Sequence, residues 1–371
     1  VLRDYQKKGL NVLLNNVHPV LGWWPRGILQ VATGGGKTEM AIALYQTLPY
    51  QTLFLVQYKQ LLDQTAERFR SYGIDPGVIG DGQLTISNYI NIATVQTIAS
   101  NLKKGNSTIE LMLRDTQQVF FDEAHGIAAT IAKGNTLVNI SALMPNAHAR
   151  WGLTATPFMR DVYSNNLLEG VTGQVLYQVS SETLIAQGYL TMPEITMVRS
   201  TEVACKSNAW PACYDAGIVL NPGRNDAIAK AVATSPKPCL VMATQVSHAR
   251  IIESRLLSAN IKTGYLDGSN STIERNSMIT ELISGRLEAI VCTTIFNAGV
   301  DIPQLQSLVM AGGGKSKVAQ LQKLGRGLRR SIGKPKVVVT DFWDSSTKTL
   351  ERHSKERKKT WESEGFNVTV K

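Results

Sequence analysis

The chain has 371 residues, 43% of them hydrophobic, and a formal net charge of +10. Charged residues are interspersed and no apolar run approaches the roughly 18 residues of a membrane span, so the composition excludes an extended disordered chain and a membrane-spanning protein. At about 100 to 200 residues per domain, the length predicts two domains, and the basic surplus favours polyanionic partners.

The ends of the chain and its cysteines give a cellular context. The chain begins with Val1 and shows no signal-peptide pattern, so we expect a piece of a longer, cytoplasmic protein. Four cysteines are scattered without CxxC spacing. This usage is typical of reduced thiols and does not indicate a zinc site.

Short apolar runs alternate with helix-like segments along the chain. This pattern is typical of parallel sheets covered by helices. Candidate strands in the first half are 28–32, 52–56, 90–94, 119–121 and 150–153. The pattern is lost between 175 and 223, and a second series follows at 239–242, 263–266, 289–292, 308–310 and 337–340. We predict an α/β fold with two domains, 1–178 and 179–371, ending in a basic helix and a short strand.

A glycine-rich loop follows the first candidate strand. Gly34, Gly35 and Gly36 leave backbone N–H groups open to a large anion, and Lys37 and Thr38 add an ammonium for phosphates and a hydroxyl for Mg²⁺. The strict phosphate-loop pattern has glycine where this chain has Val31. A flexible strand-to-helix turn is therefore the alternative, and a second element of the site is required.

Two carboxylates at the end of the strand 119–121 supply that second element. Asp122 can hold Mg²⁺, and Glu123 can orient and deprotonate an attacking water. A strand-end acidic pair also serves as a helix N-cap, but a phosphate loop upstream favours a nucleotide hydrolase. His125 is not part of an HExxH array, so a metalloprotease is disfavoured.

A basic segment in the second half can complete the hydrolase. Arg326 and Arg329 lie three residues apart and would share one face of a helix, as arginine fingers for a developing phosphate charge do. A solvated basic helix end is the alternative, and it is also the simpler interpretation of the basic tail near the C-terminus.

In order along the chain, these motifs resemble the core of superfamily 2 helicases. Residues 2–6 are similar to the adenine-reading Q motif, 32–38 to motif I, 122–125 (Asp-Glu-Ala-His) to motif II and 152–157 to motif III. Residues 55–57 with 61–64 resemble motif Ia, and 94–97 motif Ib. Residues 293–303 resemble motif V, and 322–329 motif VI.

The resemblance implies two RecA-like domains with ATP between them and a nucleic-acid strand crossing both. The implied nucleotide-binding residues are Arg3, Gln6, Thr33, Gly34, Gly35, Gly36, Lys37, Thr38, Gly299 and Asp301. The implied catalytic residues are Lys37, Asp122, Glu123, Arg326 and Arg329, with Mg²⁺ on Thr38 and Asp122. Coupling of hydrolysis to motion would involve His125, Thr154, Thr156 and Gln322. Strand contacts would involve Gln57, Thr94, Gln96, Phe158, Arg160, Thr244 and Thr293. Trp23 and Trp24 either stack on adenine or form an apolar plug.

Within the superfamily, the Asp-Glu-Ala-His sequence and the form of motif VI resemble XPB- and RecG-like DNA translocases, and phage UvsW-like helicases in particular. That resemblance implies a monomer moving 3′ to 5′ on branched DNA in recombination, replication or repair, in the host cytoplasm if the protein is phage-encoded. An RNA helicase, a restriction-enzyme motor subunit and an ATP-gated clamp that does not move share the same ATPase residues. These alternatives stay open.

Overall fold

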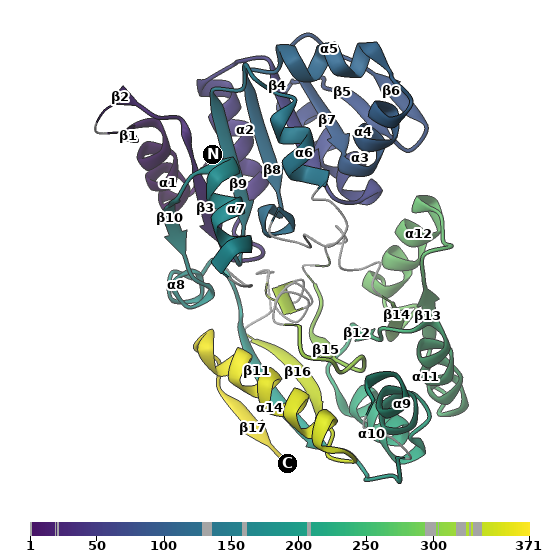
Figure 1. The fold of residues 1–371 in the computed structure, drawn as a ribbon. Helices are drawn as coiled ribbons and strands as arrows, with labels where there is room; N and C mark the ends of the chain where they lie inside the picture. The colour runs from purple at the N-terminus through teal and green to yellow at the C-terminus, as the bar shows by residue number, and fades with distance from the viewer. Residues whose placement is uncertain are drawn as a thin grey trace. The chain divides into compact units, whose positions relative to one another are not determined.

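The computed structural model describes residues 2–18, 20, 22–127, 136–157, 162–205, 209–293, 302, 304–316, 324–325, 328 and 336–371. The chain divides into two compact units, Val1–Ser180 (unit 1) and Ser181–Lys371 (unit 2). Each unit is built on one mainly parallel sheet with helices lying against it (Figure 1). The predicted α/β fold with two parallel-sheet units is confirmed.

Unit 1 contains an eight-stranded sheet in the order β10-β3-β9-β8-β4-β7-β5-β6. All neighbours are parallel except β5 and β6. The strands are β3 (Arg26–Val31), β4 (Thr52–Val56), β5 (Gly77–Gly80), β6 (Gln83–Thr85), β7 (Ile90–Thr94), β8 (Gln118–Asp122), β9 (Ala149–Thr154) and β10 (Val175–Val179). A separate antiparallel pair consists of β1 (Val17–His18) and β2 (Gly22–Trp23).

Seven α-helices are described in unit 1: α1 (Asp4–Leu14), α2 (Lys37–Thr47), α3 (Lys59–Arg70), α4 (Val95–Lys103), α5 (Ser107–Asp115), α6 (Thr136–Ala142) and α7 (Val162–Thr172). A short 3-10 turn, η1, covers Ala124–Gly126. The central strands β4 and β7 are buried along their whole length, which explains their continuous apolar sequences. Because these strands are parallel, the residues that follow them meet at one edge of the sheet.

Unit 2 contains a seven-stranded sheet in the order β13-β14-β12-β15-β16-β11-β17, with every neighbouring pair parallel. The strands are β11 (Met192–Arg199), β12 (Cys239–Met242), β13 (Thr263–Leu266), β14 (Ala289–Cys292), β15 (Ser307–Val309), β16 (Lys336–Trp343) and β17 (Val368–Val370). The described helices are α8 (Ser181–Ala186), α9 (Trp210–Tyr214), the π-helix η3 (Asp215–Val219), α10 (Pro222–Thr234), α11 (Val246–Ser258), α12 (Thr272–Ile283) and α14 (Lys348–Ser363).

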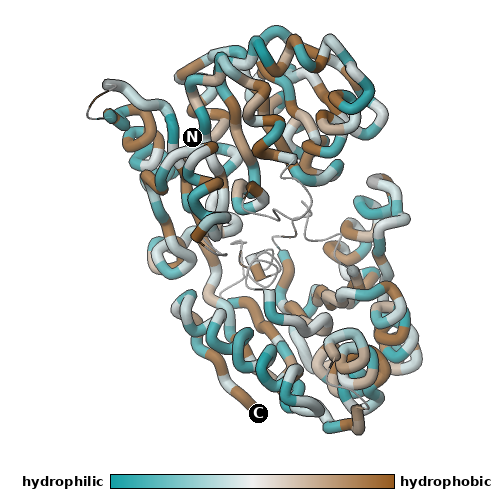
Figure 2. The backbone as a smooth tube through the Cα atoms, in the orientation of Figure 1, coloured by the Kyte–Doolittle hydropathy of each residue, from teal (hydrophilic) through white to brown (hydrophobic). Residues whose placement is uncertain are grey.

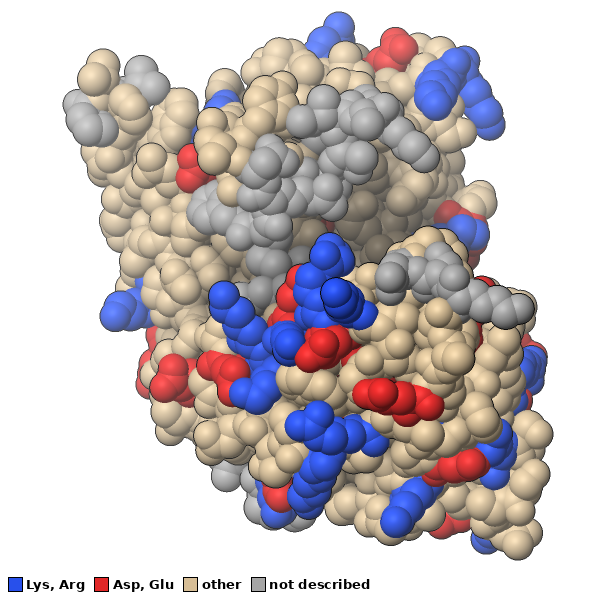
Figure 3. Space-filling view, turned by 60° about the horizontal axis from the view of Figure 1, so that its bottom comes forward, with Lys and Arg blue, Asp and Glu red and all other residues tan. Residues whose placement is uncertain are grey.

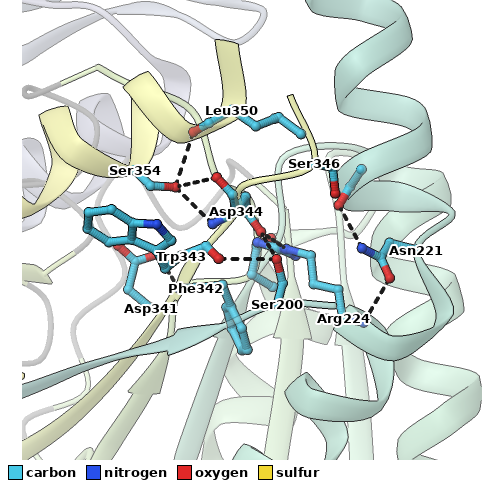
Figure 4. Close-up of polar contacts among 12 residues, drawn as sticks. Ser200, Asn221, Arg224, Asp341, Phe342, Trp343, Asp344, Ser346, Leu350 and Ser354 are labelled. Atoms are coloured by element: carbon cyan, nitrogen blue, oxygen red, sulfur yellow. Dashed lines mark hydrogen bonds and ion pairs between the residues drawn. The ribbon is translucent and has the colours of Figure 1, made fainter. Parts of the chain in front are cut away.

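A buried ion cluster joins three elements of unit 2 at the end of β16. The Nε atom of Arg224 on α10 lies 2.7 Å from Asp344 Oδ1, and the Ser200 hydroxyl donates to the same oxygen (Figure 4). On α14, Arg357 Nε lies 2.9 Å from Asp341 Oδ2. All four charged side chains are at most 1% exposed. The cluster therefore ties α10 and α14 to the end of one strand.

The same two arginines hold the loop that follows β15. Arg224 Nη1 donates to the Ala311 carbonyl at 2.8 Å, and Arg357 Nη1 donates to the Gly314 carbonyl at 3.0 Å. Buried guanidinium groups need several acceptors to offset desolvation, and both backbone and carboxylate oxygens supply them here. The loop is thereby fixed to the interior of unit 2.

The hydropathy pattern agrees with this division into sheets and covering helices. Apolar residues are concentrated in the β-strands, and hydrophilic residues are frequent on the helices (Figure 2). Across the part of the chain that the structure describes, no helix has the length and apolar character that a membrane span needs.

Candidate active site

The phosphate loop connects β3 to α2 and depends on glycine. Gly34 and Gly36 have φ angles of 86° and 77°, in the left-handed region. A Cβ atom on Gly36 would lie 2.5 Å from Gln6 Nε2, so both the backbone conformation and the lack of space require glycine at this position. The loop ends at Lys37, where the open N–H groups of the first turn of α2 favour an anion.

Helix α1 is hydrogen-bonded to this loop. The Tyr5 hydroxyl donates to the Gly35 carbonyl at 2.6 Å, and Gln6 Nε2 donates to the same oxygen at 3.2 Å. Gln6 Oε1 accepts from the Arg3 N–H at 2.9 Å. Gln6, the predicted adenine reader, is thus bonded to the phosphate loop. Tyr5 was not among the predicted site residues, because only the folded chain brings its hydroxyl to Gly35.

The acidic pair lies at the carboxyl end of β8. Glu123 has a φ angle of 49°, which is unusual for a residue other than glycine and marks a constrained position. Its N–H donates to Asp122 Oδ1 at 3.1 Å. Burial, followed by the neighbouring charge of Glu123, raises the pKa of Asp122 to about 7, while the Lys37 ammonium acts in the opposite direction. A cation at Asp122 would favour its charged form.

One chain of contacts joins the phosphate loop to the end of β9. Lys37 Nζ lies 3.9 Å from Glu123 Oε1. His125 Nδ1 lies 3.3 Å from Glu123 Oε2 and 3.1 Å from Thr154 Oγ1, and that hydroxyl accepts from the Thr156 N–H at 3.1 Å. Since a carboxylate oxygen only accepts, this geometry favours a proton on His125 Nδ1. The structure therefore brings together five of the predicted site residues: Lys37, Glu123, His125, Thr154 and Thr156.

The donor set fits a nucleotide phosphate and a hard divalent cation. The Thr33 hydroxyl, at the start of the loop, is buried and has no hydrogen-bond partner among the described residues. A phosphate oxygen is the kind of acceptor that would satisfy it. Lys37, Thr38 and Asp122 lie at the ends of neighbouring elements of unit 1 and offer an ammonium, a hydroxyl and a carboxylate, which suits phosphate with Mg²⁺.

Comparisons with known proteins relate the whole chain to helicases. Residues 1–159 match the family described as "Type III restriction enzyme, res subunit", and residues 223–331 match "Helicase conserved C-terminal domain". The chain is 27% identical to the ATP-dependent DNA helicase uvsW of Enterobacteria phage T4, over 86% of this chain and 66% of that protein. It is 23% identical to the DNA 3'-5' translocase XPB2 of Sulfurisphaera tokodaii, over 89% of this chain and 79% of that protein.

The chain has a superfamily 2 helicase core. Its fold is also that of S. cerevisiae Dbp5 bound to RNA and ADP BeF3, with a TM-score of 0.69 and 16% identity over 99% of this chain and 89% of that one. Both units of the helicase core are accordingly RecA-like. The core spans about two thirds of the T4 protein, so a large part of that relative has no counterpart in it.

The described residues that are predicted to contact nucleic acid lie at or just after the carboxyl ends of β-strands. In unit 1, Gln57 follows β4 beside Gly126, where a Cβ atom would come within 2.7 Å of its Nε2 atom. Thr94 is 3% exposed, and its hydroxyl caps α4 by accepting from the Thr97 N–H. Gln96 is exposed. The Thr94 hydroxyl is thus engaged within the protein, whereas Gln96 is accessible to a ligand.

In unit 2, Thr244 is exposed and its hydroxyl donates to the Gly312 carbonyl at 3.3 Å. Thr293 is 4% exposed and its N–H donates to the Leu266 carbonyl. The remaining predicted site residues lie outside the described residues: Phe158, Arg160, Gly299, Asp301, Gln322, Arg326 and Arg329.

The two tryptophans that precede the phosphate loop, Trp23 and Trp24, both contact neighbouring residues of unit 1. Trp24 lies 5.5 Å from the His18 ring, and the Arg26 guanidinium lies 4.9 Å from the Trp24 ring centre. Trp23 donates from Nε1 to the Leu14 carbonyl and is 43% exposed. These contacts attach the pair to the end of α1 and leave both predicted roles, stacking on adenine and an apolar plug, as predictions.

Proposed function

We propose that the helicase core is an ATP-dependent DNA helicase or translocase that remodels branched DNA. The observation that carries the ATPase half is the chain of contacts from Lys37 through Glu123 and His125 to Thr154, because it links the phosphate loop to a coupling element. If Glu123 had no contact with His125, the site could hydrolyse ATP but would have no direct contact with the coupling residues.

Each residue then has a defined task. Lys37 would bind the β- and γ-phosphates, Thr38 and Asp122 would hold Mg²⁺, and Glu123 would orient and deprotonate the attacking water. Bound Mg²⁺ would supply positive charge that neutralises the phosphates. Arg326 and Arg329, from the sequence of the second unit, would stabilise charge on the transferred phosphate.

Coupling follows from the position of His125. Its Nδ1 atom contacts both the catalytic carboxylate and the Thr154 hydroxyl. If Glu123 turned towards a nucleotide, the Nδ1 atom of His125 would keep the Thr154 hydroxyl as its remaining partner. This transfers the state of the ATPase site to the Thr154–Thr156 segment, and from there to the strand-binding residues.

Support for DNA comes from the two sequence relatives, which are described as a DNA helicase and a DNA translocase. The match of residues 1–159 to a restriction-enzyme subunit family keeps a restriction-type motor as the alternative. We further propose a monomer that acts in the cytoplasm and contacts phosphates with little sequence preference.

The test is steady-state ATPase activity at one salt concentration with no nucleic acid, single-stranded DNA, duplex DNA, a four-way junction or matched RNA. We expect stimulation by DNA that is highest with the junction, followed by junction movement in a strand-displacement assay. Equal stimulation by RNA would indicate an RNA helicase, and stimulation without displacement would indicate a clamp. A nuclease partner required for function would indicate a restriction motor.

The matched control for this assay is Lys37→Ala. This change removes the ammonium that faces Glu123, so turnover should fall to background while DNA binding remains. Turnover that survives in this variant would show that the nucleotide site is elsewhere.

A further inference from the structure

An exposed tryptophan on α9 is held in place by two buried rings. Trp210 is 37% exposed, whereas His353 and Tyr214 are 5% and 4% exposed. The Trp210 ring centre lies 4.5 Å from that of His353 and 5.2 Å from that of Tyr214, with interplanar angles of 52° and 58°. The indole is therefore held by two rings of the protein and remains partly accessible to solvent.

A chain of contacts leads from this ring to Thr244, a residue predicted to contact nucleic acid. The Tyr214 hydroxyl donates to the Gly312 carbonyl at 2.9 Å, and the Thr244 hydroxyl donates to the same oxygen at 3.3 Å. Trp210 is thus separated from Thr244 by one side chain and one carbonyl group. Both Thr244 and Gly312 follow strands, β12 and β15, whose carboxyl ends share one edge of the sheet.

Two cations lie near the same position, because Arg352 precedes His353 in α14 and Lys315 follows Gly314, whose carbonyl accepts from Arg357. Burial lowers the pKa of His353; the Glu356 carboxylate acts in the opposite direction, and the positive charges of Arg352, Lys315 and Arg357 add to the lowering. Arg357 is committed to the buried ion cluster. Lys315 and Arg352 are exposed, and Arg352 lies 3.8 Å from Glu356.

Part of the charge of α14 is balanced along the helix. Lys355 pairs with Glu351, and Lys358 pairs with Glu362. On the face of the molecule shown in Figure 3, Lys and Arg side chains are likewise interspersed with Asp and Glu. Six Lys and Arg residues nevertheless stand against three Glu residues in α14, so the helix that carries His353 keeps positive charge beside the Trp210 ring.

We propose that Trp210 is a stacking platform for an unpaired base of a single-stranded nucleic acid, with Lys315 and Arg352 meeting the adjoining phosphates. Single-stranded binding sites combine aromatic rings with cations in this way, because every base has a face on which to stack. Bases inside a duplex are already stacked on each other, so this platform favours a separated strand. The inference rests on the proposed function, because Thr244 is a nucleic-acid contact only if the protein is a helicase.

The test compares oligonucleotides with and without bases. The full chain and its Trp210→Ala variant are titrated with oligo(dT), with an oligonucleotide of equal length whose central positions are abasic, and with a duplex. We expect Trp210→Ala to bind oligo(dT) about tenfold more weakly, with little change for the abasic strand or the duplex. Trp210→Phe should retain most of the affinity because it keeps an aromatic face.

Tyr89→Ala is the matched control, because Tyr89 is an aromatic residue of unit 1 with 73% exposure. It should leave all three affinities unchanged. The stacking platform would be refuted if Trp210→Ala bound oligo(dT) as tightly as the unmodified chain does. It would also be refuted if the substitution weakened binding to the abasic strand as much as binding to oligo(dT). Either outcome would leave the proposed function standing. Absence of any nucleic-acid binding by the unmodified chain would overturn the proposed function itself.

Discussion

The buried position of Arg357 makes a sharp prediction for the stability of unit 2. Arg357, Asp341 and Asp344 are at most 1% exposed, with Arg357 Nε 2.9 Å from Asp341 and Nη2 3.4 Å from Asp344. In Arg357→Met, Arg224 still pairs with Asp344 at 2.7 Å. Asp341 loses its cation and keeps only donors such as the Phe342 N–H at 2.7 Å.

Removal of one partner of a buried ion pair costs about 3 to 5 kcal/mol, because the other charge remains buried. Since one of the two carboxylates keeps a cation, we expect a loss at the lower end, about 3 kcal/mol in the free energy of unfolding of unit 2. Arg357→Met/Asp341→Leu should recover part of this loss, because it removes the unpaired carboxylate as well.

The measurement is native-state hydrogen exchange of peptides from unit 2, because a chain of two units need not unfold in one step. Lys355→Met on the same helix is the control. The Lys355–Glu351 pair is 61% and 40% exposed at its two side chains, so its loss should cost about 0.5 kcal/mol or less. If Arg357→Met costs no more than Lys355→Met, the argument from burial is wrong.

Three further predictions concern the site and the pH dependence of unit 2. Glu123→Gln should lower ATP turnover by about 10² to 10⁴ while ATP binding, measured by titration with a fluorescent analogue, persists; turnover within tenfold of the original would contradict a base role. Thr154→Val removes the hydroxyl between His125 and Thr156, so the ratio of ATPase rates with and without DNA should fall towards one. An unchanged ratio would exclude a coupling role. Burial, with the charge of Arg224, lowers the pKa of His248 to about 3. In the unfolded chain His248 has the ordinary pKa of about 6.5, so the contribution of its neutral, folded form to stability is fully present above that pH. As the pH is lowered below about 6.5, the free energy of unfolding should decrease by about 1.4 kcal/mol per pH unit. His248→Gln should flatten the pH dependence of unfolding of unit 2 between about pH 6.5 and 4, and identical curves for both proteins would refute this assignment.

The sequence by itself determined the elements whose character is local. Fully buried parallel strands such as β4, β7, β12 and β14 are short apolar runs, and their predicted bounds agree with the structure. The helix α14 and the strand β17 in the tail were also predicted. The phosphate loop and the acidic pair were recognisable because adjacent residues carry their chemistry, and the positive φ angles of Gly34 and Gly36 explain why glycine stands there.

The sequence failed where a strand has a mixed environment. β10 lies at the edge of its sheet with half-buried side chains, and β11 alternates between buried and exposed positions beside the short β17. Both fall in the stretch 175–223, where no periodic pattern was found. A strand of this kind is stabilised by its neighbours in the sheet, so its own residues carry a weak signal.

Only the tertiary structure decided which distant side chains meet. The contacts of Tyr5 with Gly35, of Arg224 with Asp344, and of Trp210 with His353 join residues that no spacing rule connects. Such contacts depend on the order of strands in each sheet and on the helices that cover it. A local sequence pattern reports the burial and periodicity of one element at a time, whereas a partner far along the chain is fixed only when the elements pack.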